Sequence, residues 1–141
     1  MNGTVGSRMS REVMTVGPDD PLRSAVDLEM RMKIRHIPVV DDAGKLVGIV
    51  TDRDIKRALP SPLMRSARED YDSLLDGTAI AQVMTREPLS IAPEASIKEA
   101  VKLMVEKKVG GLPVVTAGKL VGIFTQTDAL KICLELLSGQ G

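Results

Sequence analysis

The chain contains one sequence written twice. Met9–Val40 aligns without gaps on Met84–Val115, and Gly44–Arg57 aligns on Gly118–Lys131 after the loss of one residue in the turn between them. The agreement is best in a Gly-Lys-Leu-Val-Gly-Ile-x-Thr-x-x-Asp segment that occurs in both copies. Short repeats usually cannot bury their apolar faces alone and therefore stack on each other. We expect two half-domains joined through one shared core.

The composition allows an aliphatic core and excludes a nucleic-acid-binding protein. Of the 141 residues, 43% are hydrophobic, yet Phe124 and Tyr71 are the only aromatic residues. Eight methionines supply adaptable filling for such a core. Nineteen basic residues balance nineteen acidic ones, so no basic field would attract a polynucleotide, and no aromatic platform would stack its bases.

Single Cys and His residues limit the metal and disulfide chemistry. With only Cys133 and His36, neither an internal disulfide nor a zinc-type ligand set can form. We expect Cys133 to be a buried or half-buried thiol on a helix. No stretch approaches the roughly 18 apolar residues that span a bilayer, and residues 1–10 lack the apolar region of a signal peptide. These patterns predict a cytoplasmic protein without membrane insertion.

Each repeat is predicted to have a β-α-β-β-α plan. In the first helix of each repeat, apolar residues recur at helical spacing over 22–30 and 97–105. Asp20 can cap the first of these helices with Pro21 at its first position, and Ser96 with Glu99 forms a capping-box pattern for the second. The predicted extended segments are 14–16, 37–40 and 46–50 in one copy and 89–91, 112–115 and 120–124 in the other.

A charged segment separates the two copies. Pro60 and Pro62 end the preceding helix, and 66–75 is predicted to be helical and to end at Gly77. We expect a surface connector over 59–77 whose Tyr71, Leu74 and Leu75 pack back on the protein. The predicted repeats are then 8–58 and 78–137.

The best-conserved pattern between the copies stands where a strand meets a helix. Thr51 and Asp54 in one copy match Thr125 and Asp128 in the other. One interpretation is a helix cap, with Thr as N-cap and Asp three residues later. The other is a ligand site, because a helix N-terminus offers N–H groups to an anion, and an ionised Asp can accept both hydroxyl hydrogens of a ribose. The preceding glycine would allow a ligand to approach the backbone closely.

A nucleotide would also need an apolar slot for its ring. In the first copy Val16 and the Ile37-Pro38 pair could supply it, and in the second copy Ile91 and the Leu112-Pro113 pair. Because the chain has almost no aromatic residues, the ring would lie between aliphatic side chains.

These features together resemble the cystathionine-β-synthase (CBS) domain pair, or Bateman module. The resemblance rests on the doubled β-α-β-β-α plan, the Pro-Val-Val strand and the Gly-Ile-x-Thr-x-x-Asp signature, and it extends from Met9 to about Leu136. It implies an α+β fold of tandem repeats packed with pseudo-two-fold symmetry. It also implies a regulatory module that binds adenosine nucleotides or related adenosyl ligands between the repeats and senses energy state. The chain looks like the small standalone bacterial CBS proteins, with a weaker similarity to the acetoin-utilisation type.

By position, the resemblance implies phosphate and ribose roles for the Thr and Asp of each signature. Charged residues distinguish the two copies, because the first has Arg53 and Arg35-His36 where the second has Thr127 and Gly110-Gly111. Charge-assisted phosphate contacts therefore favour the first site, and His36 could make its binding pH-sensitive. Alternatively, Arg35 and His36 are simply polar residues at the exposed entry of a strand. The predicted nucleotide-binding residues are Val16, Arg35, His36, Ile37, Pro38, Thr51, Arg53 and Asp54 at one site and Ile91, Gly111, Leu112, Pro113, Thr125 and Asp128 at the other.

Glu29 interrupts an apolar stripe at the position that Met104 occupies in the second copy. A charge buried alone is costly, so either this face is partly open or Glu29 meets a basic group across a subunit contact. We expect a homodimer, as is frequent among CBS pairs, and possible regulation of another protein. No catalytic set is evident, so we expect a protein that is not an enzyme and needs no cofactor other than AMP, ADP, ATP or S-adenosylmethionine as regulatory ligand. The alternative is a dimerisation adaptor with vestigial pockets.

Overall fold

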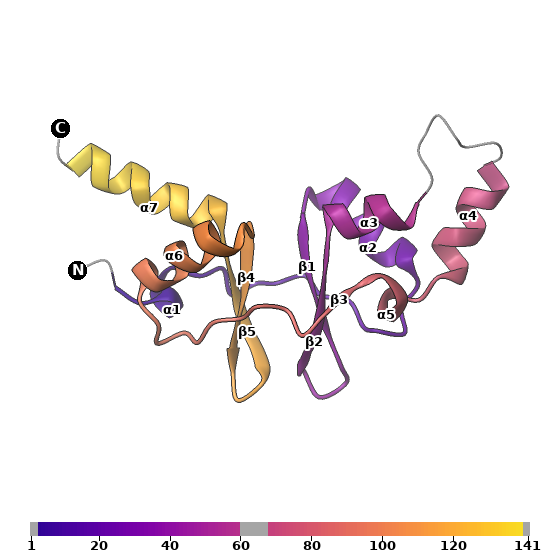
Figure 1. Cartoon of the computed structure of the whole chain (residues 1–141), viewed down its shortest axis with the longest axis horizontal. Helices are drawn as coiled ribbons and strands as arrows, with labels where there is room; N and C mark the ends of the chain where they lie inside the picture. Colours follow the sequence, from indigo (N-terminus) through magenta and orange to yellow (C-terminus); the bar gives the residue numbers. More distant parts are fainter. Residues whose placement is uncertain (1–2, 60–67, 140–141) are drawn as a thin grey trace. The chain divides into compact units, whose positions relative to one another are not determined.

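The structure, a computed structural model, describes residues 3–59 and 68–139. The chain divides into two compact units (Figure 1). One unit is Met14–Pro88, and the other combines Met1–Val13 with Leu89–Gly141. The segment that ends at Val13 therefore belongs to the unit built on the second repeat, although part of it aligns with the start of the first repeat. The repeat boundaries at 8–58 and 78–137 stay a prediction about the sequence.

The unit Met14–Pro88 is a three-stranded antiparallel sheet with helices packed against it. Its strands lie in the order β1-β2-β3. Val16 adds a parallel bridge to Val39, so the extended segment predicted at 14–16 lies beside β1. The elements are α2 (Leu22–Met32), β1 (His36–Val40), β2 (Leu46–Thr51), α3 (Asp52–Ala58), α4 (Arg68–Gly77), α5 (Ile80–Val83) and β3 (Thr85–Arg86).

The other unit repeats this plan with a two-stranded sheet. An antiparallel pair of strands is extended by two isolated bridges, Ser10 to Ile123 and Ile91 to Val114. The elements are α1 (Val5–Arg8), α6 (Ile97–Lys107), β4 (Gly111–Thr116), β5 (Lys119–Thr125) and α7 (Gln126–Gly139). The predicted β-α-β-β-α plan is thus confirmed in both copies.

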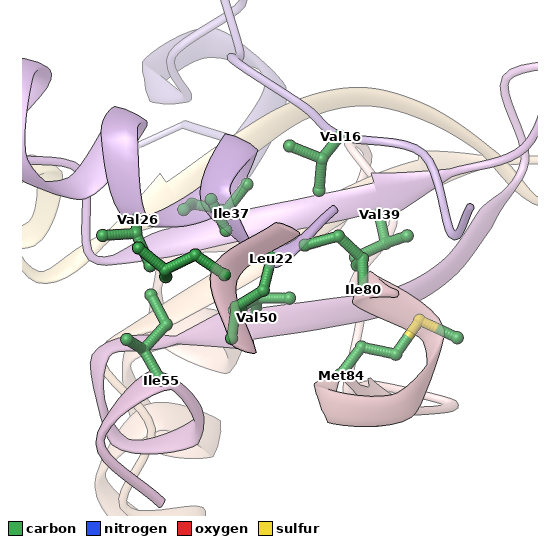
Figure 2. Close-up of a cluster of buried hydrophobic side chains, with 11 residues drawn as sticks. Val16, Leu22, Val26, Ile37, Val39, Val50, Ile55, Ile80 and Met84 are labelled. Carbon is green, nitrogen blue, oxygen red and sulfur yellow. The ribbon is translucent and has the colours of Figure 1, made fainter. Parts of the chain in front are cut away.

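The buried side chains form two clusters rather than the single shared core that the sequence suggested. One cluster lies in the unit Met14–Pro88 (Figure 2). It joins helix residues such as Leu22 and Ile80 to strand residues such as Val39 and Val50, which are all fully buried. The second cluster surrounds Phe124. Each sheet has its own helices to cover it, so each unit completes a core of its own.

The signature glycines, which the sequence suggested for the approach of a ligand, allow the backbone of the same unit to pack closely. A Cβ at Gly48 would lie 2.5 Å from Met84 Sδ and 3.0 Å from the carbonyl oxygen of Thr85. A Cβ at Gly122 would lie 2.5 Å from Met9 Sδ and 2.9 Å from the carbonyl oxygen of Ser10. In each unit, the chain that enters the other repeat crosses directly over the glycine. A side chain at either position would push this crossing segment away.

Several local expectations are corrected. Pro21 is the N-cap of α2 and not its first residue, and Asp20 accepts a hydrogen bond from the Gly17 N–H, 2.7 Å. Ser96 caps α6 as predicted, because its hydroxyl accepts the Glu99 N–H at 3.0 Å, but the Glu99 side chain does not complete the predicted capping box.

In the connector, the predicted helix is present from Arg68 to Gly77, and Pro60, Pro62 and residues 66–67 lie outside the described part. Leu75 is buried and Tyr71 packs against the same cluster, as expected. Leu74 is exposed, contrary to the expectation.

Candidate ligand-binding site

The first signature lies where β2 passes into α3. Thr51 is the N-cap of α3, and Asp54 is buried in the first turn. The Asp54 carboxylate accepts hydrogen bonds from the Thr51 N–H at 2.9 Å and from the Thr51 hydroxyl at 3.0 Å. The Thr85 hydroxyl donates to the same carboxylate at 3.2 Å. These contacts form a reciprocal capping box, so the capping interpretation describes the side chains as they stand.

The second signature has the same geometry with longer hydroxyl contacts. Asp128 accepts the Thr125 N–H at 2.9 Å and the Thr125 hydroxyl at 3.2 Å. Ser10 takes the place of Thr85 with a longer contact of 3.4 Å. Asp128 is half-buried whereas Asp54 is buried, so the Asp128 carboxylate is more accessible to a ligand.

The helix N-termini offer fewer free donors than the sequence suggested. The Asp52 N–H donates to the Arg35 carbonyl oxygen at 3.3 Å, and the Gln126 N–H donates to the Gly110 carbonyl oxygen at 3.0 Å. The third N–H group of α3, on Asp54, donates to the Thr51 hydroxyl oxygen. An anion at either helix start would therefore compete with bonds already made within the unit.

Strand pairing brings the other predicted residues beside the signatures. His36 pairs with Thr51 across β1 and β2, and Gly111 pairs with Thr125 across β4 and β5. The residues that follow each of these, Ile37-Pro38 and Leu112-Pro113, are fully buried.

The residues predicted to line the apolar slots therefore already pack inside the protein. Val16 and Ile37 belong to one cluster, and Ile91 packs against the other, to which Leu112 belongs. The Val16 N–H and carbonyl oxygen are both bonded to β1.

A pocket of about 400 Å³ opens beside the start of α3. Its lining combines three cations with two carboxylates: Glu29, Lys33, Arg35, Asp52 and Lys56. Lys56 forms an ion pair with Asp52 at 3.0 Å, one helical turn earlier. The sequence patterns pointed to Arg35 and Glu29 but not to Lys33, Asp52 or Lys56. Two sequence features could have identified these residues: the i,i+4 spacing of Asp52 and Lys56, and the position of Lys33 at the end of a helix.

The two carboxylates of this pocket influence each other. Burial raises the pKa of Glu29, and the neighbouring Asp52 raises it further. Its Oε2 atom is buried and has no hydrogen-bond partner among the described residues. The pKa of Asp52 is lowered, mainly by its bond to Lys56 and then by Glu29. The first alternative for Glu29, a partly open face, agrees with this pocket, and a basic partner across a subunit contact stays a prediction.

His36 and Arg53 differ from the charged groups of the pocket. Burial lowers the pKa of His36, and the nearby Arg35 lowers it further, so the surroundings favour the neutral imidazole. The Arg53 side chain is exposed and does not line the pocket. Arg35 is exposed at the pocket's edge, so of the predicted cations it alone joins Lys33 and Lys56.

Comparison with known proteins agrees with this doubled architecture. The CBS domain family matches residues 5–61 and 80–135, which is most of the chain. The chain belongs to the CBS domain family. A CBS domain-containing protein of Dictyostelium discoideum is 35% identical over 97% of this chain and 95% of its own length. The resemblance stated from the sequence is therefore confirmed.

Solved CBS pairs share the fold as well. A crystal structure of an acetoin utilization protein (AcuB) from Vibrio cholerae is 36% identical, with a TM-score of 0.80 over 97% of this CBS pair and 94% of that chain. CBSX2, solved in complex with AMP, is 31% identical, with a TM-score of 0.79 over 95% of this CBS pair and 98% of its chain. The predicted α+β fold and the similarity to the acetoin-utilisation type are confirmed.

Two further properties of the described residues set limits on the site. Within residues 3–59 and 68–139, no group of three or more His, Cys, Asp or Glu side chains is placed to hold a metal ion. None of the helices in that part of the chain is both long and apolar enough to cross a membrane. Cys133 is exposed on α7, so the expected burial of this thiol is wrong.

Proposed function

We propose that this CBS pair is a regulatory module that binds adenosine nucleotides or a related adenosyl ligand at two sites, one beside each Thr-Asp signature. One observation carries the proposal: the same Thr hydroxyl, Asp carboxylate and Ile/Leu-Pro strand are brought together twice by the same strand register. Capping accounts for each Thr-Asp pair and core packing accounts for the buried strand residues, so the support for a ligand is that the two features recur side by side in both units. The AMP complex of the related CBSX2 supports an adenosyl ligand.

The two sites should differ in their preference for phosphate. Lys33, Arg35 and Lys56 surround a pocket at the first site, where the second has Lys108, Gly110 and Leu130 at the aligned positions. Cations that are already gathered around one opening favour a ligand with several negative charges. We therefore expect ATP to bind the first site more tightly than AMP does, and the second site to bind ATP more weakly.

Replacing the carboxylates by amides tests the assignment without removing the caps. Asp54→Asn and Asp128→Asn keep an oxygen that can accept the Thr N–H, but they lose the ionised group that would accept two ribose hydroxyls. Each change should cost about 1.5–3 kcal/mol of binding, or about one to two decades of affinity, at its own site. Asp42→Asn, on an exposed hairpin of the same unit, is the matched control.

Calorimetry and thermal melting with AMP, ADP, ATP and S-adenosylmethionine provide the readout. A ligand that binds the native state raises the melting temperature as its concentration increases. No shift with any of these ligands, together with an intact dimer, would support the alternative of an adaptor with vestigial pockets. Unchanged affinity in both Asn variants would show that the carboxylates are caps and nothing more.

The phosphate preference needs a second set of variants. Lys33→Gln and Lys56→Gln should weaken ATP binding more than AMP binding, because AMP has fewer charges to lose contact with. Lys45→Gln, in the exposed hairpin of the same unit, changes the net charge equally and should leave both affinities unchanged. Equal losses for ATP and AMP would contradict the role of the pocket.

We also propose that the protein is a homodimer and acts on another protein in the cytoplasm. A cluster of exposed apolar side chains on α7 supports the dimer. Light scattering at tens of micromolar tests it, and a monomer with and without nucleotide would refute it.

A further inference from the structure

The Glu29 carboxylate stands in the charged pocket beside α3 without a partner of its own. Its Oε2 atom is buried and has no hydrogen-bond partner among the described residues. Asp52, the other carboxylate of the pocket, is paired with Lys56 at 3.0 Å, whereas Glu29 forms no ion pair within residues 3–59 and 68–139. Because burial without a partner favours the uncharged form of an acid, Glu29 is the more easily protonated of the two carboxylates.

The charged groups that face Glu29 come from α3 and from the segment between α2 and β1. α3 contributes Asp52 and Lys56, and the segment contributes Lys33 and Arg35. Burial raises the pKa of Glu29 and Asp52 raises it further, while Lys56 and Arg35 lower it. The net direction is upward, so the cations do not compensate for burial and for the second carboxylate.

The other described elements packed against α2 contribute no residue to the lining of this pocket. α4 turns Asp72 and Asp76 toward α2, where both pair with Arg23, nearer the start of the helix than Glu29. α5 consists of three apolar residues and a glutamine. His36, at the start of β1, is outside the lining, and its surroundings favour the neutral imidazole. The protonation of Glu29 therefore depends on the groups of the pocket itself.

A ligand with several negative charges would change the protonation of Glu29. Three cations and two carboxylates line the pocket, which leaves one net positive charge when Glu29 is ionised and two when it is protonated. A polyphosphate held by the cations brings negative charge near the carboxyl group and raises its pKa further. The protonated group can donate its O–H to a phosphate oxygen, whereas the carboxylate only repels that oxygen. Ligand and proton therefore strengthen each other's binding.

The second repeat lacks this titratable group. Met104 occupies the position aligned with Glu29 and is buried in the core of its own unit. Leu130 likewise replaces Lys56. Coupling between a proton and a ligand is therefore confined to the first site.

We propose that Glu29 takes up a proton from solvent when a polyphosphate ligand enters this pocket, so that the first site binds the ligand more tightly as the pH falls. The inference rests on the proposed nucleotide binding and adds a pH response to one of its two sites. The affinity rises as the pH falls through the pKa that Glu29 has in the complex. It levels off below the lower pKa that Glu29 has in the free protein.

Glu29→Gln tests the coupling, because glutamine is neutral at every pH and its amide can donate a hydrogen bond as the protonated acid does. A pKa change of one unit on binding corresponds to about tenfold in affinity. Glu29→Gln should therefore bind ATP about tenfold more tightly than the wild type at pH 8, and this advantage should shrink toward pH 5.5. Asp42→Asn removes one negative charge from an exposed hairpin of the same unit and should keep the wild-type pH dependence.

Calorimetry in two buffers with different ionisation heats counts the protons taken up for each ATP bound. The wild type should take up more than Glu29→Gln does. The titration of ATP itself and the second site are the same in both proteins, so they cancel in the difference. Glu29→Met, which copies the second repeat, should also lose the pH dependence but bind ATP less tightly than Glu29→Gln, because a thioether donates no hydrogen bond. Circular dichroism checks that each variant is folded.

The outcomes separate this inference from the proposed function. Equal proton uptake and equal pH dependence in the wild type and Glu29→Gln would overturn the role of Glu29 and leave nucleotide binding standing. Loss of the pH dependence in Asp42→Asn as well would assign it to the overall charge of the unit and would also overturn that role. Absence of ATP binding at every pH would overturn both the inference and the proposed function.

Discussion

Replacing the two signature aspartates by alanine should destabilise the two units unequally. Asp54 is 7% exposed and accepts hydrogen bonds from the Thr51 N–H, the Thr51 hydroxyl and the Thr85 hydroxyl. Asp128 is half-buried, and its third contact, to Ser10, is 3.4 Å long. The sequence gives both residues the same motif, so any difference in stability arises from their surroundings.

The expected magnitudes follow from these contacts. A hydrogen bond to a charged group contributes about 1.5–3 kcal/mol, and a buried donor left without a partner costs about 1–3 kcal/mol. Loss of an exposed cap costs about 1 kcal/mol. Because Asp54→Ala removes a buried carboxylate that accepts three hydrogen bonds, from half-buried Thr51 and exposed Thr85, we expect a loss of about 2–3 kcal/mol. For Asp128→Ala, where water can reach the freed donors, we expect about 1 kcal/mol.

Urea unfolding followed by circular dichroism measures both values. If the units unfold in separate transitions, each variant should shift only the transition of its own unit. Asp42→Ala, on an exposed hairpin, should stay within about 0.5 kcal/mol of the wild type. Equal losses of stability in the two signature variants, or a larger loss for Asp128→Ala, would refute the expectation that Asp54 stabilises its unit more than Asp128 does.

Three other predictions concern buried or crowded groups. Because burial lowers the pKa of His36, the protein should lose stability as the pH falls below the ordinary value of 6.5, and His36→Gln should reduce this loss between pH 8 and pH 5 in urea unfolding. Because burial raises the pKa of Glu29, its ionisation costs stability as the pH rises above the ordinary 4.5. Glu29→Gln should therefore raise the melting temperature at pH 8 more than at pH 4, and an equal gain at both would contradict this. Gly122→Ala would place a Cβ 2.9 Å from the Ser10 carbonyl oxygen and should cost about 1–3 kcal/mol, whereas Gly77→Ala, with nothing within 4 Å, should cost less in the same melting experiment.

The repeated pattern was enough to predict the local structure. Alternating apolar segments and turn residues located the strands, and Thr51 and Thr125 were expected at the helix starts that they occupy. The antiparallel pairing of two strands joined by a tight turn then brings Ile37-Pro38 beside the first signature. All these features depend on residues that are close together in the chain. Local propensity and the periodicity of the hydrophobic residues therefore predict them directly.

Only the tertiary structure decided how the copies share their segments and which charges meet. The backbone at Thr85 packs closely on Gly48, and the backbone at Ser10 packs closely on Gly122, each in the opposite repeat. Close packing therefore requires the two glycines that had suggested a ligand site. The pocket joins Lys33 to Lys56 through the packing of two helices, and the exposure of Leu134 depends on which side of α7 meets the core. Such contacts link residues far apart in sequence, and a periodic pattern can show that a face is apolar without showing whether its own core or a second molecule covers it.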